Sequence, residues 1–206
     1  MSRVQPVLIG LFLTAIVGVV VGASPARAEQ PTIQTDDRIL GDPKAPVTIF
    51  EYASLTCPHC AAFEQETFPK LKSEWIDTGK AKLVYRDFPL DDSAVLAATV
   101  ARCLPPERFF SFIETLFNTQ SQWVYRESAD SKVALARIAR TEGMSQEQFD
   151  ECTSNQKRSD AVVDSRLVAS NHYDVHNTPT FFINGTKVVG EMSYSEFVKY
   201  LDSKGD

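Results

Sequence analysis

Basic residues are the minority among the charged residues of this sequence, and repeated or compositionally biased segments are missing from it. The 206 residues include 21 lysines and arginines against 27 aspartates and glutamates, which gives a formal net charge of −6. A protein with this balance is not built to hold nucleic acid or an anionic lipid surface by charge. No repeat recurs at any period, and no tract resembles a disordered tail. With 43% apolar residues, the chain can bury the core of one domain, or of one domain carrying an insertion.

The first 28 residues have the pattern of a signal peptide rather than of a folded element. Arg3 supplies a positive start, Val7–Val21 is an uncharged apolar run, and Ala26-Arg27-Ala28 has the small-x-small pattern of a cleavage site. The run is shorter than the roughly 20 residues that a spanning helix needs. We therefore expect cleavage after Ala28, with an uncleaved membrane anchor as the alternative. Export would place the cysteines in an oxidising compartment, where disulfides persist.

The first half of the remaining chain, residues 29–206, has the pattern of a strand, a helix and a second strand. β-Branched and aromatic residues mark both strands, and apolar residues recur at helical intervals between them. A proline at position 69 predicts a kink or a break in this helix, and Gly79 is a candidate for its C-cap. We expect a loose polar arm, a strand, the helix and a second strand at residues 29–41, Val47–Tyr52, Pro58 to about Thr78 and Ala81–Phe88. A crossover of this length predicts a parallel pair of strands.

The middle of the chain, from about Leu90 to Tyr173, contains no convincing strand. Its apolar spacing predicts several helices, with a break at Pro105-Pro106 and a strongly apolar helix immediately after it. After His176 the pattern predicts a hairpin, because Asn184-Gly185 separates two short β-type runs, Thr180–Ile183 and Thr186–Val189. A last helix is expected to start at Ser193. The order β-α-β, helical block, β-β-α predicts an α/β protein of thioredoxin-like fold, with an inserted helical domain at about residues 90–174.

The strongest chemical signal is Cys57-Pro58-His59-Cys60, which follows a predicted strand and opens a predicted helix. Unpaired N–H groups and the helix dipole at such a position stabilise a thiolate at Cys57, and the thiolate is the species that attacks a disulfide. Pro58 suits the first helical turn because it has no N–H to leave unpaired. A protonated His59 would add positive charge beside the sulfur, and Cys60, one turn further, would be the resolving thiol.

Two other interpretations of the cysteine pair compete with a redox role. A structural disulfide is one, although this spacing at the start of a helix argues against it. A zinc or copper site is the other. It would need further ligands, for which the chain offers His172 and His176 but no second C-x-x-C.

At this point the sequence resembles the DsbA family of thiol–disulfide oxidoreductases, from about Thr48 to the C-terminus. Cys57-Pro-His-Cys60 is the family's arrangement, and Thr178-Pro179-Thr180-Phe181 is similar to its cis-proline loop, followed by the hairpin and the final helix. The resemblance implies that Cys57 is the nucleophile, that Cys60 is the resolving cysteine, and that Pro179 is cis and faces them. An ordinary trans proline is the alternative.

Two positions bear on the mechanism that this resemblance implies. Glu51 stands where family members carry a buried acid that accepts a proton from the buried thiol, although from spacing alone it could be a solvated residue at a strand edge. Thr178 departs from the best-known oxidases, which carry valine before the cis proline, and it is similar to the isomerase branch. The isomerases used for comparison carry an N-terminal dimerisation domain. About 17 residues between Ala28 and the first predicted strand favour a monomeric oxidase.

Cys103 and Cys152 remain after the C-x-x-C pair is set aside. Each lies on the apolar face of a predicted helix in the insertion, and we expect them to form a structural disulfide with each other. A second redox pair is the alternative, but no activating motif accompanies these two cysteines.

These observations predict a periplasmic protein that donates the Cys57–Cys60 disulfide to reduced, unfolded exported proteins. The resemblance implies reoxidation by a quinone-linked membrane partner. We expect no cofactor, because the sulfurs carry the electrons. The alternatives are an isomerase or reductase of the same fold, a copper- or zinc-binding thiol module, and a holdase-like binding module whose cysteine pair is idle.

Overall fold

The computed structural model describes Met1 and residues 29–203 of the chain. The expected signal peptide and its cleavage site fall almost wholly on residues 2–28, outside the described part, so both stay predictions. Within the described residues, no helix is both long and apolar enough to cross a membrane.

The centre of the molecule is a mixed five-stranded sheet with the strand order β1-β3-β2-β4-β5. Neighbours β2 and β3 are parallel, as the crossover predicted, and the other three pairs are antiparallel. The strands span Arg38–Leu40 (β1), Val47–Ala53 (β2), Ala81–Asp87 (β3), Thr180–Ile183 (β4) and Thr186–Val189 (β5). The thioredoxin-like α/β prediction is confirmed.

The expectation of a loose arm over residues 29–41 was wrong for residues 32–40, which are bound to the sheet. Residues 38–40 form β1, which pairs antiparallel with β3 from Arg38↔Tyr85 to Leu40↔Leu83. A three-residue strand is too short to show alternation in the sequence. It is held by its partner strand and by Gly41, whose positive φ of 96° ends it in a conformation that favours glycine.

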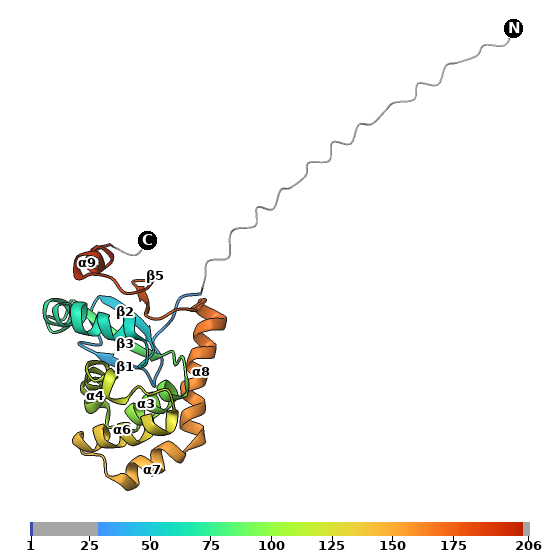
Figure 1. Cartoon of the computed structure of the whole chain (residues 1–206). Helices are drawn as coiled ribbons and strands as arrows, with labels where there is room; N and C mark the ends of the chain where they lie inside the picture. The colour runs from blue at the N-terminus through green and yellow to red at the C-terminus, as the bar shows by residue number, and fades with distance from the viewer. Residues whose placement is uncertain (2–28, 204–206) are drawn as a thin grey trace.

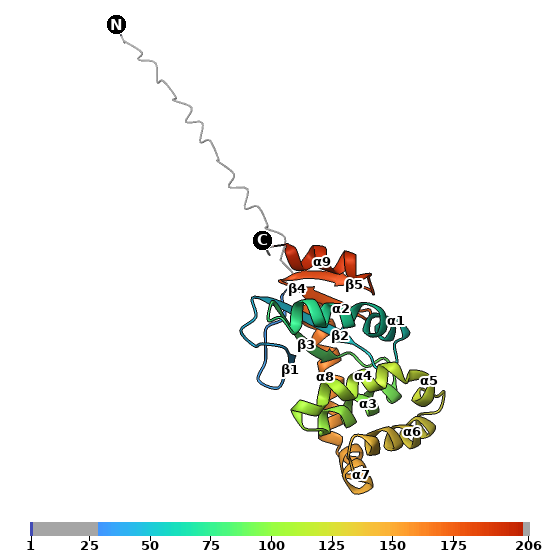
Figure 2. The ribbon, with the colours of Figure 1, turned by 90° about the vertical axis from the view of Figure 1, so that its left-hand side faces the viewer.

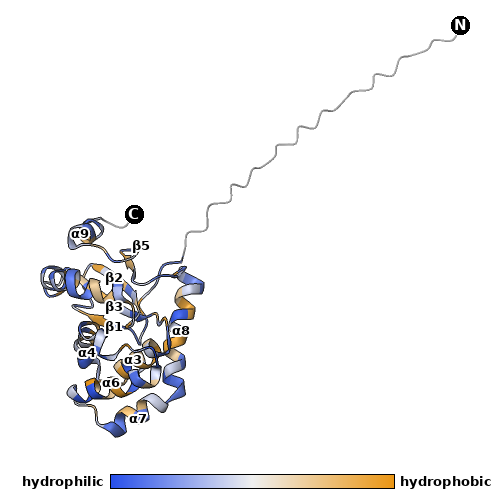
Figure 3. Cartoon of the chain, viewed as in Figure 1, coloured by the Kyte–Doolittle hydropathy of each residue, from blue (hydrophilic) through white to orange (hydrophobic). Residues whose placement is uncertain are grey.

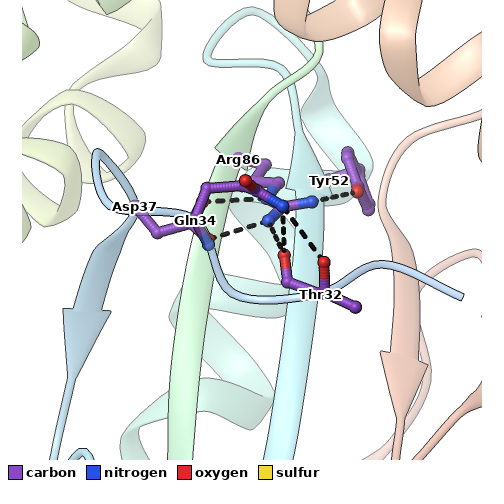
Figure 4. A network of polar contacts seen from close by, with 5 residues as sticks. All are labelled: Thr32, Gln34, Asp37, Tyr52 and Arg86. Carbon is purple, nitrogen blue, oxygen red and sulfur yellow. Dashed lines mark hydrogen bonds and ion pairs between the residues drawn. The ribbon is translucent and has the colours of Figure 1, made fainter.

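A buried salt bridge fixes the segment ahead of β1 (Figure 4). The Arg86 guanidinium, from β3, donates to both carboxylate oxygens of Asp37 at 2.9 and 2.7 Å. It also donates to Thr32 O at 2.6 Å and to the Tyr52 hydroxyl at 2.9 Å. The side chains of Arg86 and Asp37 are 9% and 6% exposed, so solvent screens this bidentate pair little. Residues 32–37 are therefore bound to the sheet.

The helix after β2 continues through Pro69. Of the two outcomes expected there, a kink or a break, the break does not occur. The helix alternates between α and π geometry, as Pro58–Ala62 (α1), Phe63–Thr67 (a π-helical segment), Phe68–Leu71 (α2) and Lys72–Ile76 (a second π-helical segment). Proline has no N–H for the bond that an α-helix would make, and the wider π turn before it accommodates the missing donor. The first π segment also turns Glu64 inward, where it is 7% exposed.

The helical insertion lies between β3 and β4 and contains six described helices, which extend from Asp92 to Tyr173. One of them, the single turn α5, was not anticipated from the sequence. They are Asp92–Cys103 (α3), Pro106–Asn118 (α4), Gln120–Trp123 (α5), Ser128–Thr141 (α6), Gln146–Ser154 (α7) and Gln156–Tyr173 (α8).

The helices pack on the sheet from several sides (Figures 1 and 2). On one face, α1, α2 and the final helix α9 (Tyr194–Asp202) enclose a core with Phe63, Phe181 and Phe197. The long helix α8 covers the other face, and hydrophobic and hydrophilic residues alternate along it (Figure 3). Helices α3 to α7 form a separate block, whose core reaches Cys57 and Cys60. Cys57 and Cys60 thus lie where the insertion meets the thioredoxin-like part.

Candidate active site

The two cysteines begin α1, directly after β2. Cys57 is the N-cap residue with an extended backbone, and Pro58 occupies the first turn. Cys57 is 4% exposed and Cys60 is fully buried. Both are free thiols in this structure, which therefore represents the reduced protein.

The first thiol is strongly activated. A hydrogen bond from the Cys60 thiol is the largest cause that lowers the pKa of Cys57 to about 5, against the opposing effect of burial. The Thr178 side chain and the backbone N–H groups of Cys60 and His59 lower it further. Donors that point at the sulfur favour its charged form, as at other helix N-termini. Cys57 is therefore a thiolate at neutral pH, and also a good leaving group.

The second thiol has the opposite character. Burial, followed by the hydrogen bond and charge of Cys57 and the charge of Glu51, raises the pKa of Cys60 well above its usual value. A sulfur that leaves a disulfide at this position must take a proton to be stable. The pair is thus asymmetric, with a stabilised thiolate at Cys57 and a neutral thiol at the fully buried Cys60.

The loop that precedes β4 faces this pair. The peptide bond between Thr178 and Pro179 is cis, as the resemblance implied. Cys57 Sγ lies 3.4 Å from the Thr178 carbonyl oxygen, although 121 residues separate the two in sequence. The fold therefore brings together Cys57, Cys60, Thr178 and Pro179 from the two halves of the sequence.

Glu51 lies on β2, the strand between β3 and β4, close enough to the cysteine pair for its charge to raise the pKa of Cys60. It is fully buried, and neither carboxylate oxygen has a hydrogen-bond partner, so the interpretation as a solvated strand-edge residue was wrong. Burial raises the pKa of Glu51 to about 8. Glu64, whose pKa is also raised by burial and then by the charge of Glu51, is its acidic neighbour. No motif in the sequence pointed to Glu64, whose side chain is buried within the first π-helical segment.

Two further residues contact the active-site turn without having been expected. Glu191 Oε2 lies 3.2 Å from Nδ1 of His59, whose side chain is 67% exposed. Gln120 Nε2, from α5, donates to the carbonyl oxygens of Leu55 and Cys57 at 2.7 and 3.0 Å. Both partners are remote in sequence, and neither belongs to a recognisable motif.

The histidines considered as metal ligands lie elsewhere. His172 pairs with Glu29, and His176 pairs with Asp174. In the described part of the chain, no three His, Cys, Asp or Glu side chains are grouped so as to hold a metal ion.

Cys103 and Cys152 form a disulfide that joins α3 to α7 within the insertion. It closes a loop with a sequence separation of 49 residues. We expect the double variant Cys103→Ala/Cys152→Ala to lose about 2–4 kcal/mol of unfolding free energy, because the unfolded chain regains the entropy that the cross-link removes. Urea denaturation, with the active-site pair reduced in both proteins, measures the loss. An unchanged midpoint would contradict a stabilising role for this disulfide.

Comparison with known proteins gives consistent matches. The Thioredoxin family model matches residues 34–203. A putative protein-disulfide oxidoreductase of Rickettsia typhi is 33% identical over 156 residues, which cover 75% of this chain but only 57% of that protein. Disulfide bond formation protein D of Bacillus subtilis is 25% identical over 191 residues, 87% of this chain and 81% of that protein. The crystal structure of Wolbachia pipientis alpha-DsbA1 is 36% identical with a TM-score of 0.78, covering 82% of this chain and 91% of that one.

Proposed function

Because the chain belongs to the thioredoxin family, and within it to the DsbA-like protein-disulfide oxidoreductases, we propose that it donates disulfides to reduced, unfolded exported proteins. The observation that carries this proposal is the contrast between the two thiols. Donors at the start of α1 hold the pKa of Cys57 at about 5, whereas burial holds that of Cys60 well above the usual range. Stabilising the Cys57 thiolate stabilises the reduced pair, which makes the oxidised pair a strong oxidant.

In the proposed reaction a substrate thiolate attacks Cys57 Sγ of the oxidised pair. The bond between Cys57 and Cys60 breaks, a bond between Cys57 and the substrate forms, and Cys60 leaves with the electron pair and takes up a proton. Glu51, protonated at neutral pH because its pKa is about 8, is placed to supply that proton. A second substrate thiolate then attacks the substrate sulfur and releases Cys57 as a thiolate. Two substrate thiols become a disulfide, and the pair gains two electrons.

The same proposal includes the location, oligomeric state and partners of the protein. It places the mature protein in the periplasm as a monomer, after cleavage of the signal peptide, and needs no cofactor because the sulfurs carry the electrons. A quinone-linked membrane oxidase would reoxidise Cys57 and Cys60. The bound substrate would lie along the Thr178–Pro179 loop, which supports this assignment by facing Cys57.

The redox potential of the pair, measured against glutathione, tests the donor role. We expect a value near the about −120 mV of strongly oxidising pairs rather than the about −270 mV of thioredoxin. In the same samples, thiolate absorbance should titrate with a midpoint near pH 5, the pKa of Cys57. A value near the reducing end would replace the donor by a reductase.

The depressed pKa of Cys57 also makes stability depend on pH in the reduced form alone. In the folded protein, Cys57 is protonated only below its pKa of about 5. In the unfolded chain, the same thiol is already protonated below its ordinary pKa of 9.0. The stabilisation is therefore fully present above pH 9 and is lost as the pH falls through 5. We expect the reduced protein to melt at a higher temperature than the oxidised one at pH 7, and this difference to vanish below pH 5. Thermal denaturation of both forms between pH 4 and 8 would show it.

An isomerase is the second candidate, and the residue that favours it is Thr178, whose side chain takes part in lowering the pKa of Cys57. Rapid repair of a test protein with scrambled disulfides, by the reduced form alone, would support this function. Oxidation of reduced substrates without repair of scrambled ones would leave the donor as the function.

A further inference from the structure

The turn between β2 and α1 is held from outside by the helical insertion. Gln120 Nε2 donates to the carbonyl oxygen of Leu55 at 2.7 Å and to that of Cys57 at 3.0 Å. The intervening residue, Thr56, donates its hydroxyl to Asp91 Oδ2 at 2.7 Å. Three consecutive residues of the active-site turn are thus each bonded to a side chain that comes from the start of the insertion or from its middle.

The side chains of Asp91 and Gln120 are themselves held in place. Asp91 uses its other carboxylate oxygen to cap α3 through the Ala94 N–H at 2.8 Å. Gln120 opens α5, and this turn ends in Trp123, which is fully buried and donates its indole N–H to Leu116 O at 2.8 Å. A carboxamide on so short and well-anchored a turn has little freedom to leave its two acceptors.

The position of this carboxamide matters for the charge on Cys57. Carbonyl oxygens carry partial negative charge, and the oxygens of Leu55 and Cys57 flank the sulfur along the chain. When both accept an N–H from Gln120, their repulsion of a thiolate is reduced, because the donor offsets their charge. The Cys57 carbonyl also accepts the first bond of α1, from Ala61 N at 3.2 Å, so Gln120 supports the same end of the helix that stabilises the thiolate.

We propose that Gln120 is a positioning residue through which the helical insertion makes the Cys57–Cys60 pair more oxidising. Its carboxamide holds the turn in the geometry that favours the thiolate and so stabilises the reduced form more than the oxidised one. The inference rests on the proposed disulfide exchange at this pair, but it concerns the difference between variants rather than the absolute potential. The helical insertion would thus stabilise the negative charge on Cys57 Sγ, in addition to covering the sheet.

Replacing Gln120 by Met keeps the length of the side chain and removes its donors. We expect the thiolate titration of Cys57 to move to higher pH, and the equilibrium constant against glutathione to shift toward the reducing side by about three- to tenfold. Tenfold corresponds to about 30 mV for this two-electron couple. The matched control is Gln122→Met, on the exposed side of the same short helix, for which both values should stay at those of the wild type.

A second variant, Gln120→Glu, keeps the volume and directs a carboxylate at the same two carbonyl oxygens. We expect a shift in the same direction and larger than that of the Met variant, since the added negative charge opposes the thiolate as well. This order distinguishes positioning from packing, because loss of packing alone would lower the melting temperatures of the oxidised and reduced forms equally and leave the potential unchanged.

Each outcome bears on one of the two proposals separately. If the wild type is oxidising but neither Gln120 variant changes the potential or the titration, the inference about Gln120 is overturned. If the wild type is as reducing as thioredoxin, the donor function fails, while the comparison between Gln120→Met and Gln122→Met still decides the role of Gln120. Melting temperatures of both redox forms show whether each variant has folded.

Discussion

Replacing Cys57 by serine is expected to reduce the rate of disulfide transfer by at least about a thousandfold, to that of the uncatalysed exchange. The reaction begins and ends at this sulfur, which is ionised because hydrogen bonds hold its pKa at about 5. A serine hydroxyl at the same place neither forms a disulfide nor ionises near neutral pH. Oxidation of a reduced two-cysteine test protein, followed by free-thiol titration, measures the rate.

The matched control for this variant is Cys60→Ser. It leaves the Cys57 sulfur in place and its hydrogen-bond neighbour as a hydroxyl, but it removes the resolving thiol. When this variant is mixed instead with the oxidised test protein, its Cys57 thiolate attacks the disulfide of that protein and one of the two substrate sulfurs leaves as a thiolate. We expect the resulting mixed disulfide to accumulate, visible as a covalent adduct that dithiothreitol removes. Transfer that survives in Cys57→Ser, or adducts formed through Cys60, would exchange the assigned roles of the two cysteines.

Glu51→Gln is expected to raise the free energy of unfolding at pH 8 by on the order of 4 kcal/mol. The folded protein keeps Glu51 protonated up to about pH 8, whereas the unfolded chain ionises near pH 4.5, so the unfolded state gains stability between these values. A shift of one pKa unit corresponds to about 1.4 kcal/mol. The wild type should therefore lose more stability than the variant as the pH rises from 4.5 to 8, because residue 51 of the variant cannot ionise.

Urea denaturation of the oxidised proteins at pH 5 and pH 8 separates this effect from a change in packing. The expected gain is large at pH 8 and small at pH 5. Glu66→Gln is the control, because Glu66 is exposed in the same helical run and should change little at either pH. Equal effects of Glu51→Gln at the two pH values would mean that Glu51 is ionised or solvated in the folded protein.

The bounds of secondary-structure elements were predicted closely where a short stretch of sequence contains both the periodic pattern and the residues that end it. The hairpin was expected at Thr180–Ile183 and Thr186–Val189, and the structure has these bounds, with positive φ at Asn184 and Gly185. The final helix begins with a capping box at Ser193, where a start was expected. Strand β1 and helix α5 lack such signals, because three or four residues show no period and depend on the partners that hold them.

The candidate site divides in the same way. The sequence predicted the residues of the motif Cys57-Pro58-His59-Cys60, because they are adjacent in the chain. The resemblance to a known family predicted the cis proline after Thr178. Neither source of information predicted that Gln120 and Glu64 belong to the site. Gln120 reaches Cys57 O across 63 residues, and Glu64 is buried in the π-helical segment that precedes Pro69. Such residues are found from the packing of whole elements rather than from any window of sequence.

The salt bridge between Arg86 and Asp37 has a practical consequence for handling the protein. By binding residues 32–37 to the sheet, it fixes where the chain departs at its N-terminal end, on the side of the sheet away from α1 (Figure 2). An affinity tag, a fluorescent label or an immobilising linker placed just ahead of Glu29 would leave from that side. Because Gln30 and Pro31 lie beside Thr48 near the start of β2, whereas Cys57 follows the end of that strand, such an attachment would leave the cysteine pair uncovered.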